Sequence, residues 1–264
     1  MTHFNVALIT EHPDEDPEPY FAPYDENAED DEFLEFEDRT QEVLDEWRND
    51  SEKHIEYPDG SRKRLWSLPH GEQEKIEEGA KKGLWKIVDV PVKELYDSPS
   101  DYAESYHGYN AYEENGQARF GCYANPDGYW DYWVPMEEAL VVNGEKVESC
   151  RCSEVEDGMR CSREKAEGMW EAFEKKNVDF MVALANAKSY EASETKEEFV
   201  AARTAFSTYA VITPDGEWHQ PGRMGRFGMS GETGEDWNTW ATSYRERFLE
   251  QYADCHIRLF DCHI

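Results

Sequence analysis

The spacing of apolar residues predicts strands at both ends of the chain. Residues 4–9 (FNVALI) are apolar almost without interruption, a pattern typical of a central strand buried on both faces. Residues 257–264 form the last apolar run, and a chain that ends on a strand indicates that the strand is tied into a sheet. Residues 206–213 (FSTYAVIT) predict another strand, which a Pro-Asp-Gly turn joins to a hairpin partner at residues 217–219. We therefore expect both terminal strands in one sheet.

The stretch 119–149 holds the densest group of aromatic residues. Its turn, Asn125-Pro126-Asp127-Gly128, precedes a predicted strand over residues 129–134 (YWDYWV). Alternation puts large rings on both faces of that strand, so we expect cover on both sides. Residues 140–147 (LVVNGEKV) read as a β-hairpin with an Asn-Gly turn of type I′. The rings are interpreted either as a core or as a pocket that stacks a planar ring or a sugar.

Elsewhere, apolar residues at spacings of three and four predict amphipathic helices. Residues 85–92 read instead as a strand interrupted by a proline, which favours an edge or a strand end. Residues 96–112, with five tyrosines, are interpreted as a mainly irregular surface segment. The helices are expected over residues 31–48, 72–82, 162–177, 178–188, 195–205 and 236–252.

The order of these elements predicts an α+β fold. Strands at both termini and at least two hairpins are separated by helices that precede or follow pairs of strands. At 264 residues the chain is long enough to bury a large core. We predict one α+β domain over residues 1–264, with a mainly antiparallel sheet, helices packed on it, and a long acidic loop at about residues 11–32.

Charge changes this picture more than any other property. The chain has 59 acidic and 27 basic residues, a formal net charge of −32. Such a surface repels nucleic acid and anionic membrane and attracts basic protein surfaces. The acidity has three interpretations. It keeps the surface solvated, or it is an adaptation to a salty host. The third is that an acidic face imitates nucleic-acid phosphate or docks on a protein that binds nucleic acid. Neither a basic leader nor a run of roughly 20 apolar residues is visible, so we expect a cytoplasmic location.

The acidic loop is the most charged segment. No lysine or arginine occurs before Arg39, and residues 11–38 contain 14 acidic side chains. Prolines at 13, 17, 19 and 23 rule out a helix in its first half. We call residues 11–32 the acidic arm and expect it on the surface, anchored by Phe21 and Tyr24. It is interpreted either as a solvated loop or as an arm presented to a partner.

Basic residues cluster at two places in the sequence, and each is a candidate site for contact with an anion. Residues 61–64 (SRKR) are the one compact basic cluster and are interpreted as offsetting nearby acid. Residues 222–229 (GRMGRFGM) contain Arg223 and Arg226 between glycines. This run lacks the Lys-Ser/Thr of a phosphate loop. It predicts either a strand that another chain approaches closely or an anion-contacting loop.

The sequence nominates no catalytic residue, cofactor or metal ligand. None of the eight histidines forms a His-Glu-x-x-His pair, and no serine nucleophile elbow occurs. Carboxylates are too numerous for one acid/base pair to be singled out. Cys150, Cys152 and Cys161 could belong to a zinc site, but a fourth ligand is unassigned and Cys-x-Cys alone is unspecific. Reduced thiols are the expectation for a cytoplasmic protein.

Several motifs together resemble a family of uncharacterised bacteriophage and prophage proteins. They are residues 120–133 (FGCYANPDGYWDYW), 21–27 (FAPYDEN), 214–229 and the ending 261–264 (DCHI). The motifs extend from one end of the chain to the other, and the first strand resembles that of the family. The family's aromatic run is usually followed by Gly-Gly-Arg-Trp, which residues 135–138 (PMEE) replace here. The resemblance implies a phage protein in the host cytoplasm and implies no activity.

These observations predict a non-catalytic phage accessory protein that binds and blocks a host factor, in host takeover or counter-defence. The expected partner is a host protein with a basic surface, with no direct nucleic-acid or membrane binding. One alternative is a protein that binds or sequesters a nucleotide-like signal in an aromatic pocket, and another is an enzyme of unknown reaction. The candidate binding residues are Tyr24, Asp25, Glu26, Asn27, Trp130, Trp133, Trp218, Arg223 and Arg226.

Overall fold

The computed structural model describes residues 3–158, 161–222 and 231–263. Its residues form two compact units. Residues 1–33 and 125–264 make the terminal unit, and residues 34–124 make the inserted unit. Both combine helices with mostly antiparallel strands, so the α+β class is confirmed. That residues 1–264 act as one domain stays a prediction.

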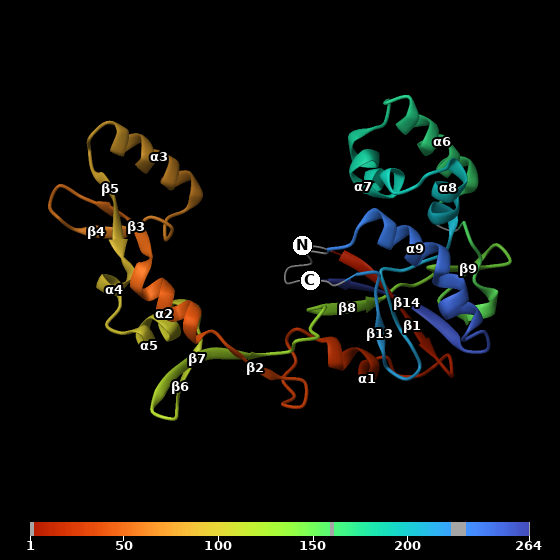
Figure 1. Cartoon of the computed structure of the whole chain (residues 1–264), viewed down its shortest axis with the longest axis horizontal. Helices are drawn as coiled ribbons and strands as arrows, with labels where there is room; N and C mark the ends of the chain where they lie inside the picture. The colour runs from red at the N-terminus through yellow and green to blue at the C-terminus, as the bar shows by residue number, and fades with distance from the viewer. Residues whose placement is uncertain (1–2, 159–160, 223–230, 264) are drawn as a thin grey trace. The chain divides into compact units, whose positions relative to one another are not determined.

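Strand β1 (His3–Thr10) lies inside the main sheet of the terminal unit. It pairs antiparallel with β14 (His256–His263) along its whole length, from His3 opposite His263 to Thr10 opposite His256. On its other side it pairs in parallel with β12 (Ala210–Ile212). In Figure 1 the red β1 and the blue β14 lie side by side. The expectation that both terminal strands share one sheet is confirmed.

Short strands complete this sheet. β13 (Trp218–His219) pairs with β12, while β11 (Ser149–Arg151) and β8 (Tyr132–Pro135) pair with successive parts of β14. The predicted hairpin is present as β9 (Leu140–Val142) and β10 (Glu145–Val147). Its turn residues have positive φ angles, 53° at Asn143 and 79° at Gly144, as a type I′ turn requires.

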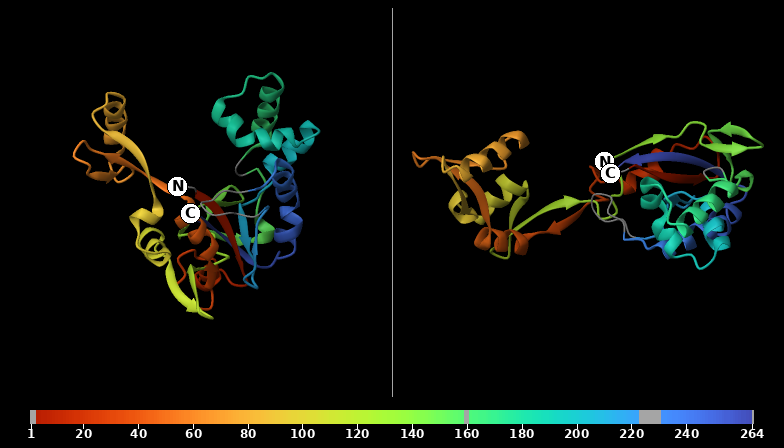
Figure 2. Two further views of the ribbon diagram at one scale, coloured as in Figure 1. Left: turned by 60° about the vertical axis from the view of Figure 1, so that its left-hand side comes forward. Right: turned by 90° about the horizontal axis from the view of Figure 1, so that it is seen from above.

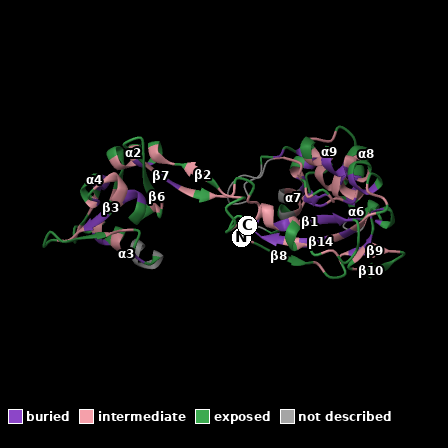
Figure 3. Cartoon of the chain, turned by 90° about the horizontal axis from the view of Figure 1, so that it is seen from below, coloured by how far each residue is buried: buried purple, intermediate pink, exposed green. Residues whose placement is uncertain are grey.

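Apolar side chains of β1 pack on both faces of the sheet. Ala7 and Ile9 belong to one core with helix α9 (Gly234–Tyr244) and the π-helical turn η5 (Arg245–Glu250). Val6 and Leu8 belong to a second core with Phe21 from helix α1 (Glu18–Phe21). The expectation that prolines rule out a helix here is wrong, because Pro17 and Pro19 lie at the N-cap and in the first turn, where proline is tolerated. All four β1 side chains have 0% exposure. Figure 2 shows the helices beside the sheet, and Figure 3 shows the burial of β1 and β14. Burial on both faces explains the uninterrupted apolar run.

Three further helices pack in the terminal unit: α6 (Arg163–Glu174), α7 (Phe180–Glu191) and α8 (Lys196–Thr204). The hydroxyl of Ser162 accepts a hydrogen bond from the Lys165 amide and caps α6. Thr195 and Glu198 form a capping box at the start of α8. The unit also contains short 3₁₀ turns, η1 (Ala22–Tyr24) and η3 (Cys152–Glu154).

The inserted unit contains two three-stranded antiparallel sheets, ordered β2-β7-β6 and β4-β3-β5. Its core gathers Val43, Val92, Tyr102 and Phe120. Its elements are β2 (Glu35–Asp38), α2 (Thr40–Asn49), β3 (Ser51–Glu56), β4 (Arg62–Arg64), α3 (His70–Lys81), β5 (Lys86–Pro91), α4 (Val92–Leu95), α5 (Pro99–Tyr102), η2 (Ala103–His107), β6 (Asn110–Glu114) and β7 (Gln117–Ala124).

Two expectations for the inserted unit are wrong in part. Residues 31–48 are not one helix, because residues 35–38 pair with β7 and the Phe36 ring packs on Tyr112 and Tyr123. Residues 96–112 are not mainly irregular, since they contain α5, the π-helical turn η2 and the start of β6. In both segments, contacts with residues far along the chain decide the structure.

In the terminal unit the predicted aromatic strand begins later than expected. Residues 132–135 pair with β14, whereas Trp130 makes an isolated bridge to Asp25. The strand expected at 206–213 is likewise shorter, 210–212. Among the described residues, no helix combines the length and the apolarity needed to cross a membrane.

Gly121 provides a test of the β2–β7 pairing. A Cβ atom at this position would lie 2.1 Å from the Glu37 carbonyl oxygen, so Gly121→Ala should lower the free energy of unfolding by about 1–3 kcal/mol. Gly168→Ala is the control, because no atom lies within 4 Å of its added methyl group and alanine favours a helix by about 0.5–1 kcal/mol. Urea unfolding followed by circular dichroism measures both changes. Equal stability of Gly121→Ala and wild type would contradict this pairing.

Candidate functional site

The acidic arm lies on the surface and is anchored by Phe21, as expected. Residues 11–32 contain eleven acidic and no basic side chains, and most of them are exposed. Phe21 has 0% exposure; its ring stacks on Trp133 with centroids 5.0 Å apart and packs on Phe260 at 4.9 Å. Tyr24 is the second anchor, because its hydroxyl donates a 2.6 Å hydrogen bond to the Gly216 carbonyl.

Backbone contacts hold the arm where it follows these anchors. The Glu26 amide donates to the Trp130 carbonyl at 2.8 Å. The side-chain amide of Asn125 donates to the carbonyls of Pro23 at 2.7 Å and Asp25 at 3.0 Å. A Cβ atom on Gly128 would lie 2.7 Å from the Glu26 Cα, so this close approach favours glycine. The arm therefore has a fixed base on the sheet.

Glu15 has a structural role that the sequence did not indicate. Its carboxylate accepts hydrogen bonds from the Tyr20 hydroxyl and from the His12 amide, both at 2.7 Å. These bonds lower the pKa of Glu15 and raise the pKa of Tyr20 to about 12. Arg258 also donates to the Glu15 carbonyl. Glu15 is therefore part of the arm's structure.

The remaining arm residues divide into turn formers and exposed acids. The Asp25 carboxylate accepts a 2.8 Å hydrogen bond from the Asn27 amide, which makes an Asx turn. Partial burial first, and then the neighbouring Asp131 and Asp25, raise the pKa of Glu26. Other acids, such as Glu29, are exposed and make no hydrogen bond or ion pair within the described part of the chain. The four candidates at 24–27 thus lie together at the arm's base.

The aromatic candidates do not form one open pocket. Trp130 is 4% exposed and meets Phe21 edge to face at 6.0 Å, so it fills the core. Trp133 is half-buried between Phe21 and Phe260. Trp130 is therefore a core residue, and the pocket interpretation of Trp133 stays a prediction. Arg223 and Arg226 lie outside the described residues.

Trp218 is the one aromatic candidate beside a hollow. Its ring centroid lies 5.0 Å from those of Tyr24 and Tyr129. The hollow has a volume of about 450 Å³ and is lined by Asp127, Tyr129, Trp218, His219, Gln220, Gly222 and Arg247. Within its lining the Trp218 indole donates to Gln220 at 2.8 Å, and the Arg247 guanidinium lies 5.1 Å over the Trp240 ring. Burial lowers the pKa of His219.

A histidine–carboxylate pair near the end of the chain was not predicted. The Nδ1 atom of His263 lies 2.6 Å from an Asp131 carboxylate oxygen, and the Asp131 amide donates to the His263 carbonyl. Tyr132 stacks on the His263 ring at 4.8 Å. The Nε2 atom of His263 is buried without a hydrogen bond to described residues. The two hydrogen bonds and the stacked ring hold the end of β14 to the segment that leads into β8. Sequence spacing gave no signal for it.

Charged residues of the inserted unit are paired among themselves. Glu52 lies 3.2 Å from Arg64 and 3.6 Å from His54, and Arg62 lies 3.0 Å from Glu56. The basic cluster at residues 61–64 therefore offsets nearby acid, as interpreted.

A second carboxylate of the inserted unit is engaged in the same way. Glu46 lies 2.8 Å from His107 and accepts a hydrogen bond from Tyr102 at 3.0 Å. Burial first and then this bond raise the pKa of Tyr102. The networks around Glu52 and Glu46 stabilise the inserted unit, because each carboxylate contacts side chains of that same unit.

The six cysteines are free thiols. Cys150 and Cys152 belong to one core cluster and Cys161 to another, so the three do not form one cluster. Burial raises the pKa of Cys150 to about 11 and that of Cys152 to about 12, which disfavours the thiolate needed by a metal. Among the described residues, no group of three or more histidines, cysteines and carboxylates is arranged to hold a metal ion.

Comparison with protein-family models, with curated proteins and with solved structures finds no match to this chain. The candidate site therefore rests on its own geometry. Among the described residues, the acidic arm is a dense group of exposed acids on a fixed base.

Tyr20→Phe tests the structural role of Glu15. The pKa of Glu15 is lowered in the folded chain, so its stabilisation is present above the usual carboxyl pKa of about 4.5 and is lost as the pH falls through the lower folded value. At pH 7 the variant should lose up to about 1 kcal/mol of unfolding free energy, and the difference from wild type should vanish at low pH. Urea unfolding over a pH series measures this.

Tyr123→Phe is the matched control, since Tyr123 is 63% exposed and its hydroxyl makes no hydrogen bond to described residues. It should match wild type throughout the series. If the loss of unfolding free energy in Tyr20→Phe stays constant as the pH falls, the hydrogen bond to the Glu15 carboxylate is not its cause.

Proposed function

We propose that the chain is a non-catalytic phage accessory protein that binds a host protein through its acidic arm and blocks it. The observation that carries this proposal is the arm itself, with eleven acids and no lysine or arginine on an anchored segment. Elsewhere, carboxylates have internal partners close by: Glu52 pairs with Arg64, and Glu46 lies 2.8 Å from His107. Exposed like charges repel one another, so a loop with only a structural role gains nothing from this density.

The chemistry of the arm indicates a partner with a basic surface. Opposite charges speed association by steering the encounter, an effect that acts over about a Debye length and weakens with salt. Host proteins that bind nucleic acid carry such basic surfaces, since they contact phosphates with lysine and arginine. An arm dense in carboxylates can occupy the same surface as the phosphates do. Its partner is then blocked by competition.

The phage assignment is supported by the resemblance of four motifs to phage and prophage proteins. Two of these motifs have a structural explanation here. Residues 21–27 contain the arm's anchors, and residues 120–133 contain Asn125, Gly128 and Trp130, which hold the arm's base. The motifs that resemble the family thus build the support of the arm.

The arm is tested by neutralising exposed acids that make no hydrogen bond to described residues. The arm variant combines Asp14→Asn, Glu18→Gln, Glu29→Gln and Asp31→Asn, and it leaves Glu15 intact. The control variant combines Glu137→Gln, Glu145→Gln, Glu148→Gln and Glu246→Gln, which are exposed positions outside the arm. Each variant removes four negative charges. Differences between them therefore report position and not net charge.

Host proteins are captured from bacterial lysate on wild type and both variants at low and high salt, and the enriched protein is purified for kinetics. At low salt, the arm variant should associate several-fold more slowly, while the control stays within about twofold of wild type. The melting temperature of the arm variant should be unchanged or higher, because repulsion is relieved. Double-stranded DNA should displace the partner.

The outcomes that would overturn the proposal are distinct. Equal association of the arm variant and wild type would exclude the arm as the docking surface. Recovery of partners with no basic surface, or binding that does not weaken with salt, would exclude the electrostatic mechanism. Unfolding of the arm variant would show that these acids are structural ligands.

A further inference from the structure

We propose that a cavity beside α7, α8 and α9 binds a small organic phosphate that carries a planar ring. The cavity lies within the terminal unit and has a volume of about 450 Å³. Cavities of roughly 300–1,000 Å³ typically hold small ligands. Helices α7, α8 and α9, the segment before β12 and Asn5 of β1 all contribute to its wall. This proposal does not depend on the acidic arm.

The charge of the lining is the reverse of the charge of the chain. Its thirteen described residues include Lys188 and Arg203 and no aspartate or glutamate. Acidic residues outnumber basic ones 59 to 27 over the whole sequence. The described lining, whose charged residues are both cations, therefore has a charge opposite to that of the chain. Within a surface that repels anions, such a wall focuses a positive potential. An anionic ligand is the chemistry that it fits.

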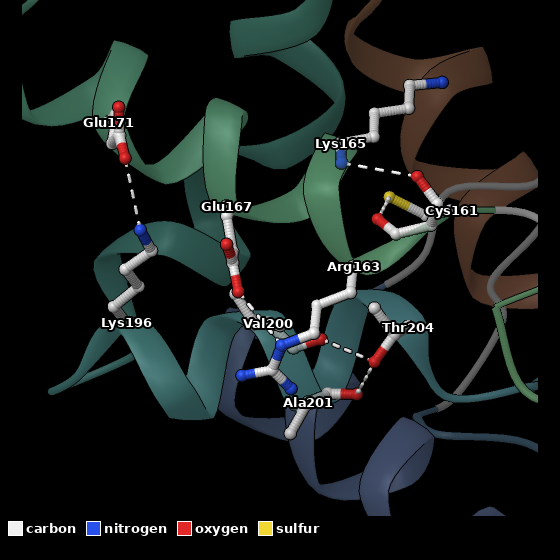
Figure 4. A network of polar contacts seen from close by, with 10 residues as sticks. Cys161, Arg163, Lys165, Glu167, Glu171, Lys196, Val200, Ala201 and Thr204 are labelled. Atoms are coloured by element: carbon white, nitrogen blue, oxygen red, sulfur yellow. Dashed lines mark hydrogen bonds and ion pairs between the residues drawn. The ribbon is translucent and has the colours of Figure 1, made fainter.

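Arg203 has the property expected of a ligand-binding side chain. Two cations on α6 and α8 have carboxylate partners: Arg163 pairs with Glu167 at 2.9 Å, and Lys196 pairs with Glu171 at 3.2 Å (Figure 4). Arg203 makes no hydrogen bond or ion pair with any described residue, and its Nε atom is buried. A planar guanidinium with free donors matches the geometry of a phosphate group.

Neighbouring groups extend the polar wall. Asn5 accepts a 3.1 Å hydrogen bond from the Tyr209 amide through its side-chain oxygen, which leaves its NH₂ group to donate. Ser189 and Asn238 bond to each other, with the serine hydroxyl donating at 2.5 Å, and so fix the α7 and α9 sides. Lys188 is exposed, and its ammonium reaches the Glu232 carbonyl at 3.4 Å. The donors thus sit on a rigid frame.

The lining also contains aromatic rings. Tyr209 and Trp237 both line the cavity and meet edge to face with centroids 5.8 Å apart. Rings of this kind favour stacked or edge contacts with a planar group. Cations and rings in one lining match a ligand with an anionic head and a flat body, of about the size of a mononucleotide.

One carboxylate lies near the cavity without lining it. Glu232 is 3% exposed, and its two oxygens make no hydrogen bond of good geometry with described residues. Burial first, and then this adjacent carboxylate, raise the pKa of Tyr209, so the tyrosine stays neutral. Glu232 should weaken the binding of an anion by repulsion. Replacing Glu232 with an uncharged residue should therefore strengthen binding, whereas replacing Arg203 or Lys188 should weaken it.

Binding to the full chain is measured by isothermal titration with adenosine 5′-monophosphate, adenosine, inorganic phosphate and benzoate. We expect the monophosphate to bind at least about 10-fold more tightly than adenosine, because only the former offers charged acceptors. Arg203→Gln should weaken it about 10-fold or more, Lys188→Met less, and Glu232→Gln should tighten it. Arg163→Gln, an exposed arginine on α6, is the control and should not change it.

A thermal melt of each variant without ligand separates loss of binding from loss of fold. Lys188→Met keeps the test decisive if Arg203→Gln does not fold, since Lys188 is exposed. Binding of benzoate but not the monophosphate would overturn the phosphate assignment in favour of a carboxylate. Monophosphate binding that all these variants leave unchanged, or no binding of any probe at millimolar concentration, would overturn the site.

Discussion

The pairing of β1 with β14 is the interaction on which the terminal unit depends. It joins the two ends of the sequence over eight residue pairs, from His3 to Thr10 on β1. Every other strand of the main sheet attaches to one of these two strands or to β12, the parallel neighbour of β1. Residues more than 240 positions apart must meet, which costs loop-closure entropy. Burial of both sheet faces, at roughly 1.5–3 kcal/mol for each large apolar side chain, offsets that cost.

The two faces of this sheet support different features. One face, through Val6, Leu8 and Phe260, receives Phe21 and fixes the base of the acidic arm. The other face, through Ala7 and Ile9, receives α9, whose Trp237 and Asn238 line the cationic cavity. Alternation along one strand therefore connects the core to both proposed surfaces. The arm collects negative charge at the surface, whereas the cavity excludes it.

Sequence periodicity was informative where local signals agree with burial. The apolar run at 4–9 and the Asn143-Gly144 turn each produced the element they predict. It failed at 31–48, where the spacing of Phe33 and Phe36 suits a helix but pairing with β7 makes residues 35–38 a strand. The arm's anchors were predictable because aromatics within an acidic loop need cover. The cationic cavity was not, because Lys188 and Arg203 come together only through the packing of α7 and α8.

The carboxylates of the inserted unit and those of the acidic arm differ in whether they have partners within the chain. In the inserted unit, Glu46 accepts hydrogen bonds beside His107 and Glu52 faces Arg64, so their partial burial is compensated. In the arm, exposed acids keep full hydration, and their repulsion is weakened by salt instead of by partners. Such charge adds nothing to the stability of the sheet that carries it. The negative potential of the arm extends into solvent and attracts a basic surface before the two proteins touch. The arm should therefore affect the rate of association more than the free energy of folding.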